Sequence, residues 1–136
     1  MLRVRTLEQI TREFYERVSS GDVAGVIDLV DDDIIWSIPG PSVIPYAGTY
    51  RGKEGVAEFF RILAEHEDLQ SFVPNEFIFD QENGVACILG CEKARAILTG
   101  RSFSTTWAEV FHVRGGLVTA FEEHIDTFKL AEAYTP

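Results

Sequence analysis

The feature that most constrains the fold is the stretch at residues 101–127, which is typical of one long antiparallel hairpin. Side chains alternate along a strand, so Trp107, Glu109 and Phe111 share one face of the first arm. Two adjacent glycines, Gly115 and Gly116, then turn the chain. We therefore expect the rest of the chain to be arranged around this hairpin.

The length of the turn decides which residue of the second arm faces Glu109. A three-residue loop opposes Glu109 to Glu123, whereas a two-residue Gly-Gly turn opposes Glu109 to Glu122. One residue of slip exchanges the two faces of an entire strand. We favour the three-residue loop, because it pairs Phe111 with Phe121 and sends the more polar side chains to the other face.

The favoured register places two carboxyl groups side by side. Directly opposed residues in an antiparallel pair have Cα atoms about 4.5 to 5.5 Å apart, so Glu109 and Glu123 would be neighbours in an apolar surround. Desolvation and like-charge repulsion would keep one of them protonated near neutral pH, giving an acid and a base side by side. Two alternatives stay open: one glutamate lies at a wet rim, or Lys93 or Arg95 on the preceding strand neutralises the pair.

Charge and composition exclude several classes of partner. The 136-residue chain suits one domain over residues 1–136, and it carries a formal net charge of −10 with a pI near 4.6. Nucleic acid and anionic membranes require a basic surface, so we expect neither as a partner. The first ten residues lack the apolar core of a signal peptide and no apolar run could span a bilayer, so we expect a cytoplasmic protein. Cys87 and Cys91 show neither disulfide geometry nor metal-ligand spacing.

Three helices are predicted before the main sheet. Thr6 and Gln9 fit a capping box for a first helix that continues to about residue 20. Gly21 can end that helix in a left-handed conformation, and Asp22 can cap a short second helix. The third helix is predicted at residues 54–66.

Extended segments dominate from residue 69 onward. We predict four strands joined by tight turns, at residues 71–80, 85–98, 102–113 and 118–126, and a shorter strand at residues 34–38. Pro74 cannot donate to a ladder, so its strand should lie at a sheet edge or carry a bulge. Helices followed by an antiparallel meander indicate an α+β fold, in which a curved antiparallel sheet wraps around the three N-terminal helices and leaves an internal pocket.

The segment at residues 39–52 is rich in proline and glycine, which indicates a long ordered loop. Long loops in compact domains are often functional. Tyr46 and Tyr50 in this loop combine an apolar ring with a polar tip. They suit the mouth of a pocket, or they anchor the loop to the core.

Several short motifs resemble those of a known family. They are WSIPG at residues 36–40, PYAGTYRG at 45–52, TGR at 99–101 and FHVRGG at 111–116, leading to Asp126 and Thr127. With the order of the elements, they resemble the SnoaL-like and ketosteroid-isomerase-like branch of the nuclear-transport-factor-2-like superfamily over nearly the whole chain. The resemblance implies a cone-shaped sheet with a pocket, and a homodimer formed through the outer sheet face. The same scaffold serves isomerases, polyketide cyclases, epoxide hydrolases and proteins that only bind.

The resemblance can be carried over residue by residue. In ketosteroid isomerases a tyrosine of the first helix and an aspartate after the first strand act on the substrate, and these positions are here Phe14 and Ile38. Only the acidic donor on the penultimate strand is retained, as Glu109. Relatives similar to limonene epoxide hydrolase or to SnoaL place an acid on the last strand, which falls at Glu123 or, for the cyclases, also near Glu122. A strict ketosteroid isomerase is therefore not implied.

Two functions from different classes follow. In the first, Glu123 is a general base and Glu109 a protonated donor of an isomerase, cyclase or epoxide-hydrolase-like enzyme acting on a small hydrophobic molecule, with no metal or organic cofactor. In the second, the same cavity binds a small apolar ligand without turnover. In both we expect ligand contacts from Trp36, Tyr46, Trp107, Phe121, Phe14 and Ile38, although the two tryptophans could equally be core residues.

Overall fold

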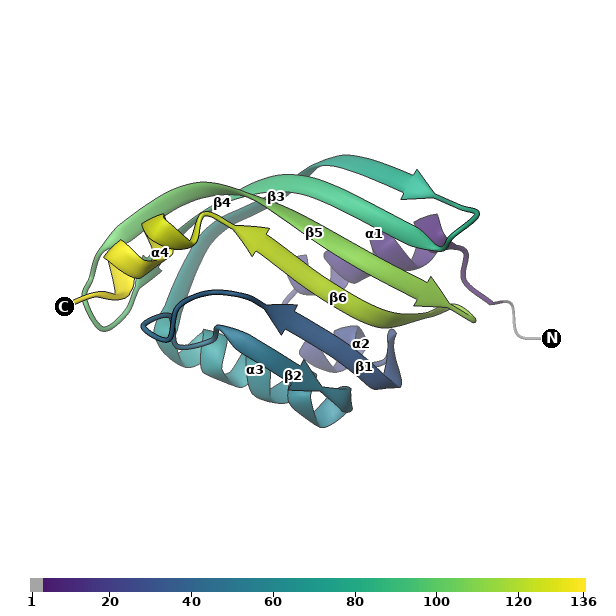
Figure 1. Cartoon of the computed structure of the whole chain (residues 1–136), viewed down its shortest axis with the longest axis horizontal. Coiled ribbons are helices and arrows are strands. Elements are labelled where there is room, and N and C mark those ends of the chain that lie inside the picture. The colour runs from purple at the N-terminus through teal and green to yellow at the C-terminus, as the bar shows by residue number, and fades with distance from the viewer. Residues whose placement is uncertain (1–3) are drawn as a thin grey trace.

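Within residues 4–136, which the computed structural model describes, two helices come first, a third follows two short strands, and a fourth follows the last strand (Figure 1). The elements are, in chain order, α1 (Leu7–Ser19), α2 (Val23–Ile27), β1 (Val30–Ile38), β2 (Gly48–Arg51), α3 (Gly52–His66), β3 (Glu67–Asp80), β4 (Val85–Ala96), β5 (Ser102–Arg114), β6 (Leu117–Ile125) and α4 (Thr127–Tyr134). No helix in this part of the chain is long and apolar enough to cross a membrane.

The strands form one sheet in the order β2-β1-β6-β5-β4-β3. The sheet is curved and unclosed, and its long strands β3, β4 and β5 arch over α1, while α3 lies along β1 and β2 (Figure 1). The predicted α+β class, with a curved sheet wrapped around N-terminal helices, is confirmed. The pairing of β1 with β6 is parallel and the other pairings are antiparallel, a detail that a simple meander does not include.

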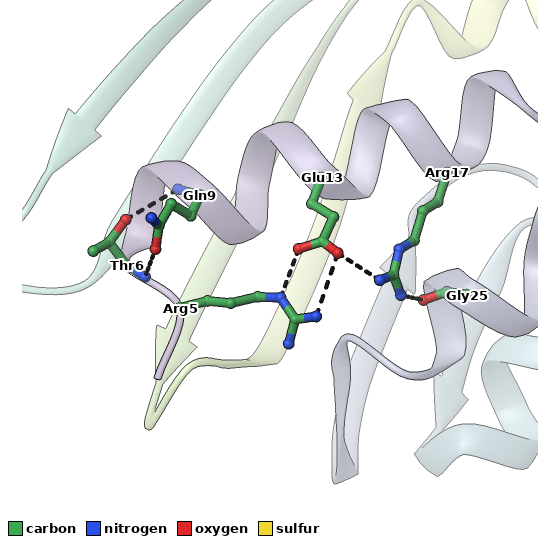
Figure 2. A network of polar contacts seen from close by, with 6 residues as sticks. All are labelled: Arg5, Thr6, Gln9, Glu13, Arg17 and Gly25. Carbon is green, nitrogen blue, oxygen red and sulfur yellow. Dashed lines mark hydrogen bonds and ion pairs between the residues drawn. The ribbon is translucent and has the colours of Figure 1, made fainter. Parts of the chain in front are cut away.

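The predicted starts of α1 and α2 are confirmed. Thr6 Oγ1 accepts a hydrogen bond from the Gln9 backbone N–H at 3.1 Å, and Gln9 Oε1 accepts one from the Thr6 N–H at 2.9 Å (Figure 2). Gly21 follows α1 with a φ of 72°, a conformation that glycine adopts without steric cost. Asp22 then caps α2 by accepting a hydrogen bond from the backbone N–H of Gly25.

A chain of charged side chains ties α1 to α2. Glu13 accepts hydrogen bonds from Arg5 and from Arg17, and Arg17 also donates to the carbonyl oxygen of Gly25 (Figure 2). The contact satisfies a carbonyl of the short α2 helix, which has few internal hydrogen bonds of its own. It holds the two helices as a hairpin.

Three boundaries differ from those expected. β1 begins at Val30 instead of residue 34, because Val30 pairs with Val118 of β6 and the acidic residues after it project outward from the strand. β2 lies within the segment expected to be a loop, since the free edge of β1 pairs with it. β3 begins at Glu67 directly after α3, where the backbone pairs with the end of β4.

The β5–β6 register pairs Glu109 with Glu123 and Phe111 with Phe121, as favoured from the sequence. The turn itself was expected to have three residues and has two, because Arg114 pairs with Leu117. Gly115 and Gly116 adopt φ values of 60° and 74°, as tight hairpin turns require. A bulge after His112 then leaves Thr119 as an extra residue on β6 and restores the favoured pairing.

The prediction for Pro74 is also confirmed. β3 is an edge strand, and its ladder with β4 shifts register between Pro74 and Glu76. The missing N–H of proline is thus placed where the ladder is already interrupted.

Cys87 and Cys91 in the neighbouring strand β4 are free thiols.

Candidate active site

A partly open cavity of about 70 Å³ lies between the concave face of the sheet, α1 and α3. Its lining is mostly apolar and aromatic, with four glutamates among it. The lining residues are Phe14, Val18, Trp36, Ile38, Tyr46, Phe59, Phe60, Leu63, Glu67, Leu69, Phe72, Glu92, Glu109, Phe121 and Glu123.

Strand alternation explains why the glutamates face inward. Glu92 shares its face of β4 with Ile88 and Ala94, both of which are fully buried. Glu109 follows the same rule on β5, between the inward Trp107 and Phe111. These carboxyl groups occupy positions that the strand pattern reserves for the core.

Glu109 is held by a phenol from α1. Its side chain is only 4% exposed, and its Oε1 accepts a hydrogen bond from the Tyr15 hydroxyl at 2.7 Å. The Tyr15 ring is buried and packs edge-on against Phe111 and face-on against Trp107, which fixes the direction of the hydroxyl. Burial and the nearby Glu109 charge raise the pKa of Tyr15 well above its usual value, so the hydroxyl remains a donor.

Glu123 lies directly across the hairpin from Glu109, and their side chains share a hydrogen bond. Burial raises the pKa of both groups. For Glu109 the hydrogen bonds from Glu123 and Tyr15 oppose that rise in pKa, whereas for Glu123 the hydrogen bond to Glu109 and the Glu109 charge raise the pKa further. Of the two groups, Glu123 therefore holds its proton to the higher pH, although this side chain keeps some exposure toward the cavity.

The neighbouring Glu122 is placed on the opposite face of the sheet. Its side chain is 43% exposed and lies 3.4 Å from His124, which belongs to the same outer row. A shift of the register by one residue would exchange the sheet faces of Glu122 and Glu123. The bulge in β6 sets the register that places Glu123 on the inner face.

Glu67, the first residue of β3, forms a second polar cluster in the cavity. Its Oε1 accepts hydrogen bonds from the hydroxyls of Tyr46 at 2.8 Å and Tyr134 at 3.3 Å. Burial raises the pKa of Glu67, and the two hydrogen bonds act in the opposite direction. Tyr46 thus both lines the cavity and anchors its loop, and the Tyr50 hydroxyl reinforces the anchor by donating to the Tyr46 carbonyl oxygen at 2.9 Å.

Glu92 differs from the other three glutamates in having no partner. It is 8% exposed, and within residues 4–136 its carboxyl group makes no hydrogen bond to another group. Burial, followed by the charges of Glu123 and Glu67, raises the pKa of Glu92 to about 9.

The possibility that a neighbouring cation neutralises the carboxyl pair is wrong. Lys93 points outward from β4 and is exposed, while Arg95 pairs with Asp68 at 3.4 Å near the surface. The residues that line the cavity include no lysine, arginine or histidine. Nor is any group of three or more His, Cys, Asp and Glu side chains within residues 4–136 arranged as a metal site.

Five of the six residues expected to contact a ligand line this cavity. These are Phe14, Trp36, Ile38, Tyr46 and Phe121. Trp107 is the exception, since it is a core residue stacked on Phe72 at 4.6 Å and on Tyr15 at 6.0 Å. It supports the Tyr15 ring instead of facing the cavity.

Sequence reasoning missed Tyr15, Glu67 and the role of Glu92. The expected inward stripe of the first helix contained Phe14, but Tyr15 extends a second inward row with Leu7 and Thr11 at four-residue spacing. Alternation along the strand of residues 85–98 could have identified Glu92 as inward, because it shares a strand face with Ile88 and Ala94. Glu67 could not be found, because the strand was expected to begin four residues later.

A family model described as the SnoaL-like domain matches residues 11–121. The crystal structure of an NTF2-like protein from Burkholderia xenovorans LB400 is 30% identical, with a TM-score of 0.86, and the match covers 98% of this chain and 100% of that one. Among the curated proteins, none matches the chain.

More distant crystal structures share the fold. TerC, co-crystallised with polyporic acid, is 20% identical with a TM-score of 0.83, and the match covers 94% of this chain and 97% of that one. A candidate isomerase from Rhodopseudomonas palustris is 22% identical with a TM-score of 0.76, over 97% of both chains.

Proposed function

The chain belongs to the SnoaL-like domain family, and we propose that it is an acid–base enzyme that exchanges protons with a small hydrophobic substrate held in the cavity. The observation that carries this proposal is the cross-strand pair Glu109 and Glu123, joined to the Tyr15 hydroxyl inside an apolar lining. Structures named as an isomerase or found with an organic acid share the fold, which is compatible with such a reaction.

The two carboxyl groups suit different roles. Glu109 accepts hydrogen bonds from both Tyr15 and Glu123, so it is the carboxylate and the general base. Glu123 retains the proton and is the general acid. This reverses the roles expected from the sequence, where nothing revealed the hydroxyl of Tyr15 beside Glu109.

An enolisation follows from this arrangement. The Glu109 carboxylate takes a proton from the carbon next to a substrate carbonyl, while Glu123 donates its proton to the carbonyl oxygen, which gives a neutral enol. Return of the proton from Glu109 to another carbon of a conjugated system, with Glu123 recovering the hydroxyl proton, gives the isomer and restores both carboxyl groups. Attack of the enol on a second carbonyl would instead close a ring, so isomerases and cyclases can share the first step.

Hydrogen exchange of a simple ketone tests the proposal. Cyclohexanone in deuterated water should lose its α-protons faster with the protein than in buffer alone, as followed by proton NMR. Glu109→Gln should reduce the enzymatic rate by about 100-fold or more, because the base is removed. Glu122→Gln, on the outer face of the same hairpin, is the matched control and should leave the rate unchanged.

Two outcomes separate the proposal from a purely binding role. If cyclohexanone quenches the fluorescence of Trp36, which lines the cavity, but no exchange above buffer occurs, the protein binds without turnover. If exchange occurs but survives Glu109→Gln, the reaction does not use this pair.

A further inference from the structure

The proton exchange proposed above does not use Glu92, a buried carboxyl group in the cavity lining. It is more than nine-tenths buried, lines the cavity and has no hydrogen-bond partner within residues 4–136. Glu67 and Glu109, by contrast, each accept hydrogen bonds from tyrosines. A buried carboxyl group without a partner is costly unless a ligand supplies one.

The groups that face Glu92 are almost all acidic. Glu67 comes from the start of β3, Glu109 from β5 and Glu123 from β6, and the phenol of Tyr134 approaches from α4. The cavity-lining residues of α1 and α3 are apolar and carry no charge. An anionic ligand would be repelled by the ionised carboxyl groups of this cluster, whereas a cation would be attracted to them.

The aromatic residues of the lining also favour a cation over an anion. The Trp36 ring packs against Phe121 at 4.0 Å, Phe59 at 5.3 Å and Phe60 at 5.7 Å, and all four residues line the cavity. Aromatic faces attract cations, and tryptophan attracts them most strongly. A cation in this cavity would thus meet carboxyl groups on the sheet side and rings around them.

We propose that Glu92 binds a protonated amine, so that the substrate of this cavity is a small hydrophobic molecule with a basic nitrogen. The ammonium N–H groups donate to the Glu92 carboxylate, and the apolar body lies against Trp36 and its neighbouring rings. This inference rests on the proposed function, because it names the substrate class of the same cavity.

Binding of the amine should release a proton, and this release can be measured. In the free protein Glu92 is protonated at neutral pH, since burial and its acidic neighbours raise its pKa to about 9. When the ammonium group binds, Glu92 ionises to pair with it, and its proton passes to the buffer. Each bound amine should therefore release about one proton at pH 7.5.

Three ligands of one size test the proposal by titration calorimetry: benzylamine, benzyl alcohol and benzoate, which are cationic, neutral and anionic. Benzylamine should bind at least about tenfold more tightly than benzyl alcohol, and benzoate most weakly. Titrations in phosphate and in Tris, which differ in enthalpy of ionisation, report the released proton. Glu92→Gln should weaken benzylamine binding by about tenfold or more and abolish proton release, whereas Glu122→Gln should change neither.

Benzyl alcohol binding as tightly as benzylamine would overturn the proposal, as would unchanged benzylamine affinity in folded Glu92→Gln protein. Absence of benzylamine binding at millimolar concentration would overturn it as well. Cyclohexanone exchange involves no amine, and its dependence on Glu109 is read from the wild type and Glu109→Gln alone. Failure of the amine proposal is thus distinguishable from failure of the Glu109 and Glu123 chemistry, which is read from that exchange.

Discussion

A single hydroxyl group makes Glu109 and Glu123 different from each other. The two carboxyl groups face each other across one hairpin and are both withdrawn from solvent, but only Glu109 receives a hydrogen bond from Tyr15. A hydrogen bond to the charged form of an acid lowers its pKa relative to an unbonded neighbour. In the proposed reaction, the phenol therefore determines which carboxyl group serves as the base.

Removing that hydroxyl should move the acid limb of the proposed activity. In Tyr15→Phe the ring remains, but Glu109 loses a hydrogen bond to its ionised form, so its pKa should rise further. The lower limb of the pH profile for cyclohexanone exchange should therefore shift to higher pH. Tyr46→Phe is the control, because it removes a hydrogen bond from Glu67 instead. An unmoved profile in Tyr15→Phe would show that the phenol does not act on the base.

Glu92 should make the stability of the protein depend on pH. The pKa of Glu92 is raised to about 9 in the folded protein from its ordinary value of 4.5, so the folded state holds this proton more tightly than the unfolded state. Its contribution is fully present below about pH 4.5 and is lost as the pH rises toward 9.

Glu92→Gln should remove that dependence. The free energy of unfolding of the wild type, relative to Glu92→Gln, should fall by a few kcal/mol between pH 5 and pH 9, and urea unfolding at several pH values measures it. Glu76→Gln on the exposed edge strand is the control. Parallel pH curves for the wild type and Glu92→Gln would contradict the assignment of Glu92 as a buried, protonated group.

At the scale of elements, strand alternation predicted which side chains face the cavity. The turn and the bulge that set the register could not be predicted in this way. The pattern of aromatic residues favoured the pairing of Glu109 with Glu123, and this pairing is present. The expected three-residue turn is absent, because a two-residue Gly-Gly turn and a bulge at Thr119 together produce the same register. Threonine in a strand carries no local signal for a bulge, so this compensation could not be read from the sequence.

Residues that meet across distant elements were the hardest to predict. The helical pattern placed Phe14 inward, but the contact of Tyr15 with Glu109 joins residues 94 positions apart and depends on how α1 lies under the sheet. Glu67 was not predicted as a site residue, because the sequence around it is polar and does not indicate that a strand begins directly after α3. Local periodicity predicts which face a side chain occupies, and tertiary packing decides which hydroxyl reaches which carboxyl group.

The close packing of Trp107 of β5 and the backbone of β3 against β4 depends on a glycine, Gly90. A Cβ atom at Gly90 would lie 2.2 Å from the Trp107 ring and 2.5 Å from the Val73 carbonyl oxygen. Gly90→Ala should therefore reduce the free energy of unfolding by about 3 kcal/mol, because either the ring or the edge strand must move.

The comparison variant is Gly100→Ala. There a Cβ meets nothing within 4 Å, but the φ of 74° is unfavourable for alanine, so a loss of about 1 kcal/mol is expected. Urea unfolding of both variants measures the difference. Equal losses would mean that the approach of Trp107 to the backbone of β4 is not tight.

For the whole molecule, the curved sheet separates an inner face that encloses the cavity from an outer face that remains open. The outer face includes Val110 and Ala120, whose strands are neighbours in the sheet. Apolar side chains on an open sheet face are typical of subunit contacts, and the sequence resemblance also predicts a homodimer. This remains a prediction about the protein in solution.

Sedimentation equilibrium tests the prediction. The expected mass is twice the chain mass of 15.3 kDa, and Val110→Lys should yield a monomer, because the new charge would be buried in the contact. Ala57→Lys on the exposed side of α3 is the control and should remain dimeric. A wild type that sediments as a monomer at all concentrations would contradict the prediction.

The titration of Glu109 and Glu123 tests the central claim most directly. Carbon-13 NMR of the labelled glutamate carboxyl groups, assigned with Glu109→Gln and Glu123→Gln, follows both protons in the ligand-free protein. The account predicts two separate steps, with both pKa values raised, Glu123 keeping its proton to the higher pH, and the pKa of Glu123 falling when Glu109→Gln removes the neighbouring charge. Two independent titrations near the ordinary glutamate pKa of about 4.3 would contradict it.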